Sequence, residues 1–549
     1  MADKWWMKRF RRLMTGFDVG DDPVVREVGY VPFDDPTLAE RFADFLADAD
    51  IQVFYTHVKN HQGKMLYPSK VGPMHPFLGE RDFFGEFLEA CHKRDIKCCG
   101  MMQVCYDVLM SKRHPEWAQV DEQGRRAPTG QGGYYCCFNN PDRAEYFLAL
   151  VDEAVRRYDM DGLAFDEFKF LSSSRKVTTV CYCEHCNRQF RDKHGFDIPP
   201  GPPDVTQAAW RAFIAWRYAT RDNFARRLRE TCNAVRPEMP ITHINVPNSF
   251  QNYWKKGVST AGTAALIDFI CNDQSPKSAL NDSERFKYYR AMVPGPNDHT
   301  LDLYVGDGVE PHYKTCNWCD APHPDYLLAT QATALGVGAS TGLDTLCPNR
   351  GLPTETQQQR IKQMMAWTKK LDEWLPDVTP LSSVGLINSE ATCDFYGGDS
   401  PSLWRASYLG CFKALTDAAH LFDVMPTPLF LRRGTTIPEN IRVLVLPNLV
   451  FLTDEEIEVI REFVANGGGV VATGMTSLGN EEFAYRENFA LADAFGVDYL
   501  SGREEDGDFL SVEDKEATLK LISFFKCVST HDVVRDVGHE GVCHLLGPR

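Results

Sequence analysis

Short apolar runs and amphipathic stretches alternate along the chain from Phe42 to residue 375. A short, wholly apolar run is typical of a buried strand, and apolar residues spaced three or four apart are typical of a helix that faces a core. These patterns predict helices at 83–93, 144–158 and 210–235, and strands at 51–55 (the first strand), 97–104, 161–168, 241–245, 266–272, 301–306 and 335–346. One βα unit after another over this length predicts an eight-stranded (β/α) barrel, the TIM barrel.

A proline-rich segment at 375–380 interrupts this pattern and marks a domain boundary. Beyond it, apolar runs at 384–388, 442–447 and 468–474 alternate with helical patterns at 403–420 and 454–466. This order predicts a second α/β domain that is doubly wound like flavodoxin. We therefore expect a barrel over 1–378, a flavodoxin-like domain over 379–500 and a charged C-terminal extension over 501–549, whose structure the pattern leaves open.

The charge and composition of the chain argue against some classes of binding partner. The 549 residues carry a formal net charge of −17, which argues against nucleic acid or an anionic membrane as the main partner. The N-terminus is basic but lacks an uninterrupted apolar segment, and no run elsewhere is long and apolar enough to span a bilayer. We therefore expect a cytoplasmic protein in which most of the 18 cysteines are reduced.

Two adjacent carboxylates, Asp166 and Glu167, close the apolar strand that begins at Asp161. In α/β barrels the carboxyl ends of the strands carry the active site, so this pair is the strongest candidate for chemistry. Hydrolysis of a glycoside needs two carboxyl groups that flank the scissile bond. Because adjacent strand residues point to opposite sides, we expect the partner carboxylate to come from another strand. The candidates are Asp273, Asp307 and Glu310.

Further polar and aromatic residues follow the predicted strands at the same end. Such side chains hydrogen-bond to sugar hydroxyls and stack on the apolar face of a pyranose ring. A single histidine or loop carboxylate of this kind more often has a structural role, because such residues are common in cores and loops. The predicted substrate-binding residues are His57, His61, Asp107, His114, Asn245, Glu310, His312 and Trp318.

Three cysteines lie close together at Cys181, Cys183 and Cys186. Ordinary buried cysteines are scattered, whereas this spacing lets three thiolates converge on one zinc ion, whose tetrahedral coordination needs a fourth ligand. Cys136 and Cys137 are the nearest upstream candidates for that ligand. Zinc held by four thiolates has no open position for water, so we expect a structural site and not a catalytic one.

The succession YYCCFNNP, helix, strand, Asp-Glu and CYCEHCNRQF closely resembles the glycoside hydrolase family 42 β-galactosidases. The resemblance implies a small carbohydrate as substrate and Glu167 as the acid/base group. Its zinc ligands would be Cys137, Cys181, Cys183 and Cys186. The segment LVLPNLVFLTDEEIEVIREFVANGGGVVATG also resembles that family's trimerisation domain, which implies a homo-oligomer, a trimer.

The chain departs from that family at two positions. Family 42 ends its fourth strand with Asn-Glu, whereas this chain has Asp166 and Glu167. The family's nucleophile is a glutamate at the seventh strand, where this chain has Asp307, with Glu310 further on. DGLAFDE and the upstream HPEW look more like an uncharacterised branch of barrel hydrolases, which is also similar to α-L-fucosidases. The fucosidase resemblance implies that Asp166 is the nucleophile and that Asp273, Asp307 or Glu310 donates the proton.

From these residues we predict a glycoside hydrolase, retaining and exo-acting on small oligosaccharides or glycosides, without an organic cofactor. A zinc-dependent hydrolase or lyase is an alternative if Cys137 is not a ligand. A glutamine amidotransferase is another alternative, because its fold is similar to that of the second domain. Its chemistry needs a cysteine on a sharp strand-to-helix turn, and the matching turn here, Gly474-Met-Thr-Ser477, has no cysteine. The non-enzymatic alternative is a carbohydrate-binding barrel that has lost its catalytic pair.

Overall fold

The computed structural model describes residues 4–17, 32–129, 132–171, 179–244, 253–272, 279–292, 301–307, 324–345, 351–353, 355–372, 374, 381–396, 402–432 and 434–499. Contacts divide the chain into two compact units. The first takes in 1–201, 212–247 and 254–379, and the second takes in 202–211, 248–253 and 380–549. The predicted C-terminal extension, 501–549, lies outside the described residues.

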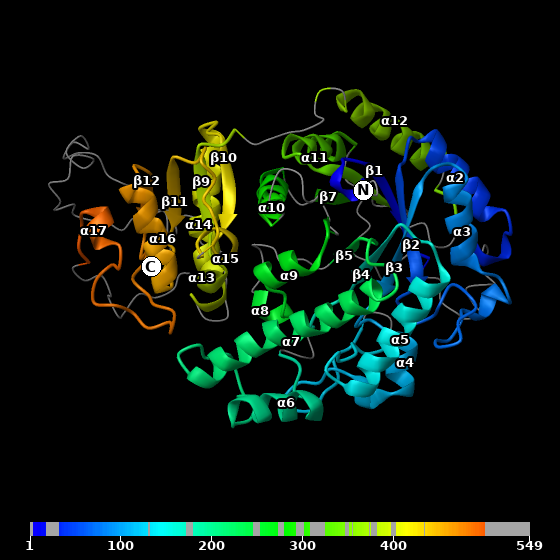
Figure 1. Cartoon of the computed structure of the whole chain (residues 1–549), viewed down its shortest axis with the longest axis horizontal. Helices are drawn as coiled ribbons and strands as arrows, with labels where there is room; N and C mark the ends of the chain where they lie inside the picture. The colour runs from blue at the N-terminus through cyan, green and yellow to red at the C-terminus, as the bar shows by residue number, and fades with distance from the viewer. Residues whose placement is uncertain are drawn as a thin grey trace, which may run out of the picture. The chain divides into compact units, whose positions relative to one another are not determined.

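Eight parallel strands form the sheet of the first unit (Figure 1). They are β1 (Arg11–Thr15), β2 (Val53–Lys59), β3 (Lys97–Gln103), β4 (Gly162–Asp166), β5 (Ile241–His243), β6 (Ile270–Asn272), β7 (Leu301–Asp307) and β8 (Ser340–Thr345). Their order is β5-β4-β3-β2-β1-β8-β7-β6. Arg12 of β1 lies opposite Val53 of β2 on one side and opposite Gly342 of β8 on the other, so the first and last strands are neighbours.

The strands at the two ends of this order, β5 and β6, close the sheet on itself. The Thr242 hydroxyl of β5 donates a hydrogen bond to the carbonyl of Phe269 (2.7 Å) and accepts one from the N–H of Cys271 (3.1 Å). The N–H of Asp268 donates to the carbonyl of Ile241 (2.8 Å). These contacts complete the eight-stranded (β/α) barrel, and the predicted fold of this part of the chain is confirmed.

The first strand of the barrel is β1, which the sequence pattern missed, and the predicted first strand at 51–55 is therefore β2. Two of the five residues of β1 are arginines, so its composition is not that of a buried strand. Both are nonetheless buried. The Arg11 guanidinium donates to the carbonyl of Asp50 (2.8 Å), and the Arg12 guanidinium lies 5.5 Å from the centre of the Tyr55 ring. Partners distant in the sequence make these contacts, and no local pattern reveals them.

Alternate residues of the strands fill the barrel interior with one apolar cluster. Its members include Met14, Val53, Tyr55, Cys99, Met101, Ala164 and Cys271. Because side chains alternate between the two faces of a strand, the next inward positions toward the carboxyl ends are His57, Gln103 and Asp166. A polar layer therefore covers the apolar interior at the end where barrel enzymes carry their active sites.

Helices alternate with the barrel strands and lie outside them (Figure 1). The helices up to residue 371 are α2 (Leu38–Asp48), α3 (Phe83–His92), α4 (Val108–Arg113), α5 (Pro141–Arg157), α6 (Glu184–His194), α7 (Ala208–Asn233), α8 (Tyr253–Lys256), α9 (Thr260–Leu266), α10 (Ala279–Ala291), α11 (Pro324–Gly336) and α12 (Glu355–Leu371). The three predicted helices correspond to α3, α5 and α7. The Asn140 side chain accepts from the N–H of Arg143 (3.1 Å) and caps α5, the helix that leads into β4.

The sheet of the second unit is also parallel. Its strands are β9 (Val384–Asn388), β10 (Phe422–Pro426), β11 (Val443–Pro447) and β12 (Gly469–Thr473), in the order β10-β9-β11-β12. Its helices are α13 (Glu390–Phe395), α14 (Ser402–Asp417), α15 (Thr427–Phe430), α16 (Asp454–Ala465) and α17 (Ala492–Phe495). The strand order reverses between β9 and β11, as in doubly wound folds of the flavodoxin type. The predicted fold is confirmed, although the sequence pattern missed β10.

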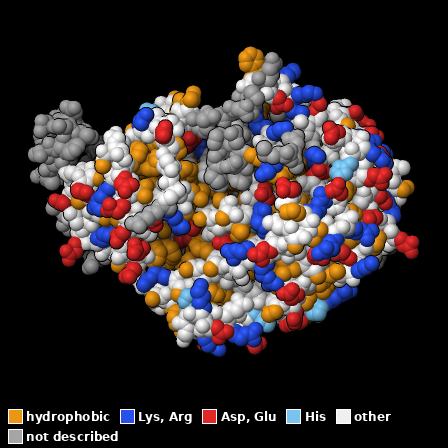
Figure 2. All heavy atoms as spheres, in the orientation of Figure 1, with side chains coloured by type: hydrophobic (Ala, Val, Ile, Leu, Met, Phe, Trp, Pro, Cys, Tyr) orange, Lys and Arg blue, Asp and Glu red, His pale blue; other side chains and the backbone are white. Residues whose placement is uncertain are grey.

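The distribution of charged side chains on the surface of the described residues indicates which kinds of partner are unsuitable. On the face shown in Figure 2, acidic and basic side chains are interspersed, and the described residues present no extended basic patch there that would suit a nucleic-acid backbone. Among the described helices, none is both long and apolar enough to cross a membrane.

Candidate active site and cysteine cluster

The backbone at the end of β4 holds two adjacent carboxylates in one site. The N–H of Val104 donates to the carbonyl of Asp166 (2.8 Å), and the N–H of Cys105 donates to the carbonyl of Glu167 (3.1 Å). Glu167 has φ +50°, in the left-handed region, which costs a non-glycine residue about 1–3 kcal/mol. Its own N–H donates to Oδ1 of Asp166 (2.6 Å). Because Glu167 is not extended, the strand alternation that separates adjacent side chains ends at Asp166.

Two donors hold the carboxylate of Glu167. Lys169 Nζ lies 3.0 Å from Oε2, and the hydroxyl of Tyr135 donates to the same oxygen at 2.9 Å. Burial raises the pKa of Glu167, but Lys169, His61 and the Tyr135 hydrogen bond together outweigh burial and hold that pKa below its ordinary value. Burial and the neighbouring carboxylate raise the pKa of Tyr135, so the phenol remains a donor. Glu167 is therefore held as an anion.

The pKa of Asp166 is shifted in the opposite direction, above its ordinary value. Oδ2 of its carboxylate lies 3.9 Å from Nε2 of His61. Burial first, and then the negative charge of Glu167, raise the pKa of Asp166, while His61, Lys169 and a hydrogen bond from Gln103 oppose the rise. Of the two carboxyl groups, Asp166 is therefore the one that keeps a proton to higher pH.

A row of packed rings connects the neighbours of the two carboxylates. The ring of His61 packs edge-on against Tyr106 at 5.0 Å between centroids, and Tyr106 packs against Tyr135 at 5.4 Å. His57 packs against His61 at 5.5 Å, and its Nδ1 accepts a hydrogen bond from the N–H of Phe17 (3.1 Å). Packing thus fixes the groups that act on Asp166 and Glu167 relative to one another.

Such a pair is suited to acid–base chemistry. Enzymes obtain a proton donor and a lasting anion from two carboxyl groups by giving them environments that push their pKa values apart. Here burial and a like charge raise the pKa of Asp166, whereas a cation and a phenol lower that of Glu167. A protonated carboxyl group in this position can donate to a leaving oxygen, and the adjacent anion can stabilise positive charge that develops nearby.

Two other predicted binding residues have protein partners. Asp107 is fully buried, accepts from the N–H of Met110 (2.9 Å) as the cap of α4, and lies 3.0 Å from Nζ of the buried Lys59. His114 stacks on Trp117 at 4.1 Å, and its Nδ1 lies 3.0 Å from a Glu116 oxygen. Of the predicted residues, the structure brings together His57, His61, Asp166 and Glu167.

The candidates for the second carboxylate lie later in the chain. β7 ends at Asp307, which pairs in register with Thr345 at the end of β8. Because all eight strands are parallel, Asp307 stands at the same rim of the barrel as Asp166. The other predicted site residues lie outside the described residues: Asn245, Asp273, Glu310, His312 and Trp318.

Sequence analysis did not single out three residues that act directly on the pair: Lys169, Tyr135 and Gln103. Lys169 follows Glu167 by two positions and Tyr135 precedes Cys137 by two, so both lie in motifs that were noticed for other residues. Gln103 ends β3 and pairs in register with Asp166. For Lys169 and Gln103 the available signal was their place near strand ends, whereas Tyr135 had none beyond its motif. The fold determined which carboxylate each one meets.

The predicted cysteine ligands converge. The sulfur atoms of Cys137, Cys181, Cys183 and Cys186 all lie within 4.8 Å of one another. Cys137 Sγ is 3.5 Å from that of Cys186 and 3.8 Å from that of Cys183. A tetrahedron with metal–sulfur bonds of about 2.3 Å has edges of about 3.8 Å, so the spacing fits one ion bound by four thiolates. This cysteine cluster can therefore hold a metal ion.

Local structure explains which cysteines meet. Cys183 is the residue before the first turn of α6, and Cys186 lies within that turn. Cys137 is held near them because its N–H donates to the carbonyl of Trp117 (2.7 Å). Cys136, the other candidate for the fourth ligand, packs instead with Met110 and Trp117. With four thiolates there is no open position for water, which disfavours a zinc-dependent hydrolase.

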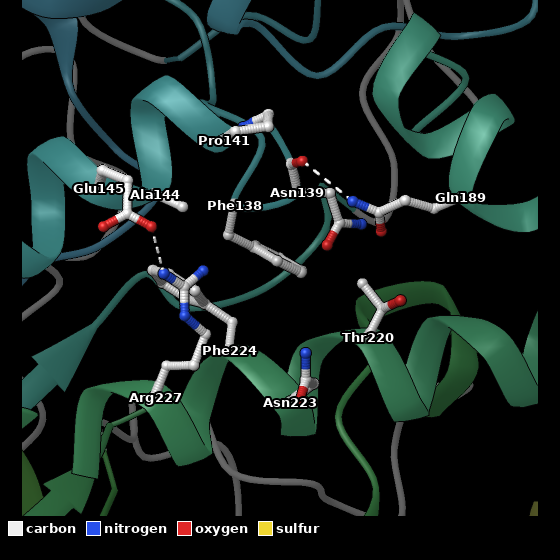
Figure 3. Close-up of a pocket in the computed structure, with 10 residues that line it drawn as sticks. All are labelled: Phe138, Asn139, Pro141, Ala144, Glu145, Gln189, Thr220, Asn223, Phe224 and Arg227. Atoms are coloured by element: carbon white, nitrogen blue, oxygen red, sulfur yellow. Dashed lines mark hydrogen bonds and ion pairs between the residues drawn. The ribbon is translucent and has the colours of Figure 1, made fainter. Parts of the chain in front are cut away.

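A surface cavity of about 140 Å³ adjoins the cysteine cluster, between α5, α6 and α7 (Figure 3). Asn139 connects the two, because its Nδ2 donates to Sγ of Cys186 (3.4 Å) and its carbonyl accepts from Nε2 of Gln189 (3.3 Å). Arg227 pairs with Glu145 (2.6 Å) on the same wall. The ten residues that line this cavity include none of the predicted site residues.

Comparison with protein families identifies the part of the chain that contains the carboxylate pair. Residues 38–167 match the family described as hypothetical glycosyl hydrolase 6. The match begins at the first residue of α2 and ends on Glu167, so it covers the barrel wall from α2 through β4. No curated protein matches the sequence.

Solved structures of two kinds of glycoside hydrolase resemble the chain. The α-L-fucosidase isoenzyme 2 from Paenibacillus thiaminolyticus has a TM-score of 0.66 at 20% identity, over 86% of this chain and 65% of that chain, so the chain spans less than two thirds of its length. The β-galactosidase from Bacillus circulans sp. alkalophilus has a TM-score of 0.69 at 15% identity, over 90% of this chain and 76% of that one. That from Rahnella sp. R3 has a TM-score of 0.68 at 15% identity, over 89% and 75%. At these identities the similarity shows the fold alone.

Proposed function

We propose that the chain is a glycoside hydrolase that cleaves O-glycosidic bonds, retaining and exo-acting on a small oligosaccharide or glycoside. The observation that carries the proposal is the pair of adjacent carboxylates at the carboxyl end of β4, in which Lys169 and Tyr135 hold Glu167 while Asp166 faces His61. The family match that ends on this pair and the fold shared with β-galactosidases and an α-L-fucosidase both support it.

In this proposal Asp166 is the proton donor and Glu167 is the anion that keeps it protonated. Loss of the proton from Asp166 would leave two negative charges side by side in a partly buried site, which is unfavourable. Lys169 and Tyr135 favour the anion of Glu167, so Glu167 does not take the proton instead. This division of roles differs from the family 42 resemblance, which makes Glu167 the acid/base group, and from the fucosidase resemblance, which makes Asp166 the nucleophile.

The second carboxylate in this proposal is Asp307, at the end of β7. Its place on the same rim as Asp166 supports it, and Asp273 and Glu310 are the alternatives. Retention of configuration requires the two carboxyl groups to stand about 5–5.5 Å apart, whereas inversion requires about 6.5–9.5 Å. We propose that His61, which lines the same rim, binds a hydroxyl of the sugar. The other predicted binding histidine, His57, is buried with its two ring nitrogens bonded to Phe17 and Gln103, so we propose that it supports His61.

We also propose that the cysteine cluster binds zinc. Four thiolates in tetrahedral spacing suit zinc, and such closed sites are structural. The ion would brace the loop between β4 and α6 and take no part in hydrolysis. The resemblance of the second unit to a trimerisation domain supports a homotrimer, and the reduced thiols that the cluster needs support a cytoplasmic location.

The test is hydrolysis of α- and β-nitrophenyl galactosides, fucosides, arabinosides and glucuronides by the wild-type protein, with the anomer of the product followed by NMR. Turnover of one glycoside identifies the substrate class, and a product with the anomeric configuration of the substrate shows retention. Substrates with different leaving groups then show whether Asp166 is the proton donor or the nucleophile. If Asp166 donates the proton, Asp166→Asn loses far more activity on a nitrophenyl than on a 2,4-dinitrophenyl glycoside, because the better leaving group needs no proton.

Equal losses on the two leaving groups would instead make Asp166 the nucleophile. If the protein binds sugars but cleaves no member of the panel, the alternative of a carbohydrate-binding barrel is favoured. The absence of both turnover and sugar binding would contradict the proposed function.

A further inference from the structure

We infer that Gln119 is a positioning residue for the carboxylate pair: its amide ties together the two chain segments that bring Tyr135 and Lys169 to Glu167. The inference rests on the proposed function, because it assigns Gln119 a role through the groups that set the charge of Glu167. Gln119 is fully buried, and it lies shortly after the Pro115–Trp117 turn, far from β4 in the sequence.

The side-chain amide of Gln119 bonds to both segments. Its Nε2 donates to the carbonyl of Cys136 (3.2 Å) and to the carbonyl of Lys169 (3.2 Å). Its Oε1 accepts from the N–H of Leu171 (2.9 Å). The backbone N–H of Gln119 donates in addition to the carbonyl of Tyr135 (2.7 Å). One residue thus holds the backbone at Tyr135 and Cys136 on one side and at Lys169 and Leu171 on the other.

These bonds fall on the residues that act on Glu167. The Tyr135 hydroxyl donates to Glu167 Oε2 at 2.9 Å, and Lys169 Nζ lies 3.1 Å from Oε1 and 3.0 Å from Oε2. Without the Gln119 side-chain amide, Cys136, Lys169 and Leu171 would lose the partner that they share, and only the backbone bond from Gln119 to Tyr135 would remain. Both donors would then be free to shift away from the carboxylate, since long side chains on a displaced backbone no longer reach the same point.

A positioning role and a purely structural role make different predictions. If Tyr135 and Lys169 move away, the pKa of Glu167 rises because it loses its cation and its phenol. The pKa of Asp166 rises as well, because the Lys169 charge also lowers it. The high-pH limb of the pH profile of kcat/KM, which follows the loss of the proton from Asp166, would therefore move to higher pH. A purely structural role would reduce the amount of folded protein and leave that limb in place.

The test compares Gln119→Met with Gln331→Met. Gln331 is a matched control, because it is also buried, and its Oε1 accepts from the Thr368 hydroxyl (3.2 Å) between α11 and α12. We expect Gln119→Met to move the high-pH limb upward by about 0.2 pH units, less than the loss of the Lys169 charge itself would cause, and Gln331→Met to leave that limb in place. In a Tyr135→Phe, Lys169→Met background, Gln119→Met should cause no further shift.

Crystal structures of the two variants make the test independent of turnover. We expect the Tyr135–Glu167 and Lys169–Glu167 distances to lengthen in Gln119→Met and to stay unchanged in Gln331→Met. If both distances stay unchanged in Gln119→Met, or if the high-pH limb does not move in an active variant, the inference is wrong. If Gln119→Met does not fold, Gln119→Asn, which keeps an amide one methylene shorter, should show the same lengthening. A wild-type protein without any turnover would contradict the proposed function and leave the structural comparison to decide on Gln119.

Discussion

The cysteine cluster and the carboxylate pair follow one another in the sequence, and both gather ionisable side chains of one kind out of water. They differ in the symmetry of what surrounds each group. In the cysteine cluster four equivalent sulfur atoms face one another within 4.8 Å. In the carboxylate pair the partners are unlike: Glu167 has a lysine and a tyrosine within 3.0 Å, whereas Asp166 has a histidine at 3.9 Å.

Exposure separates the two sites in the same way. Cys137, Cys181 and Cys186 are 0% exposed and Cys183 is 8% exposed, whereas the side chains of Asp166 and Glu167 are 13% and 15% exposed. Equivalent, buried donors can all be satisfied by one ion, and nothing is left to react. Unlike surroundings at the edge of solvent leave one carboxyl group with a proton that a substrate can take. Four equivalent, buried ligands therefore suit a structural metal site, whereas unlike surroundings of two carboxyl groups suit a catalytic site.

The largest effect should come from the group with the proton. We expect Asp166→Asn to lower kcat/KM by about 10²–10⁴-fold on the nitrophenyl glycoside that the wild type cleaves, because the amide cannot donate a comparable proton. Asp152→Asn is the control, since Asp152 pairs with Arg156 (2.8 Å) on the exposed face of α5. Activity of Asp166→Asn within tenfold of the wild type would remove Asp166 from the chemistry.

A change in the cysteine cluster should affect stability more than chemistry. We expect Cys186→Ser to abolish the zinc binding that we propose for the cluster and to lower the melting temperature, because a ligand at 1,000 times its dissociation constant stabilises the folded state by about 4 kcal/mol. Metal content and calorimetry measure both. Cys232→Ser is the matched control, since Cys232 is equally buried but lies in α7 outside the cluster. Equal zinc in the two variants would exclude the cluster as the metal site.

Glu167→Gln tests the cause of the asymmetry. The negative charge of Glu167 raises the pKa of Asp166, so its removal should lower that pKa. Activity is lost when Asp166 gives up its proton, and the high-pH limb of kcat/KM should therefore move down by about one pH unit. Glu116→Gln, at an exposed carboxylate, should not move it. An unmoved or raised limb in Glu167→Gln would show that burial alone keeps the proton on Asp166.

Lys169→Met should shift the same limb in the opposite direction and by less. The lysine charge lowers the pKa of both carboxyl groups, so without it both pKa values rise and the profile moves to higher pH. Its effect on Asp166 ranks below that of Glu167, and we expect a shift of about half a unit. Lys97→Met is the control, because Lys97 pairs with Asp161 (3.0 Å) near the opposite ends of β3 and β4. A downward shift in Lys169→Met would contradict the described electrostatics.

Patterns within short stretches of the sequence determined the fold class of both units. Alternating apolar runs and helical patterns predicted the barrel and the doubly wound domain, because burial of one face requires a period that the sequence itself displays. The close spacing of Cys181, Cys183 and Cys186 predicted three members of the cysteine cluster, because these three lie within a few residues of one another.

Tertiary structure decided whatever depends on partners that are distant in the chain. It placed the two arginines of β1 inside the barrel wall, and it selected Cys137 over Cys136 as the fourth cysteine of the cluster. It also turned Glu167 into the left-handed conformation and brought Tyr135 onto it. Two adjacent acids are equivalent in the sequence. They differ in the fold because the energy of a charge depends on burial and on neighbouring charges, and only the folded chain supplies these.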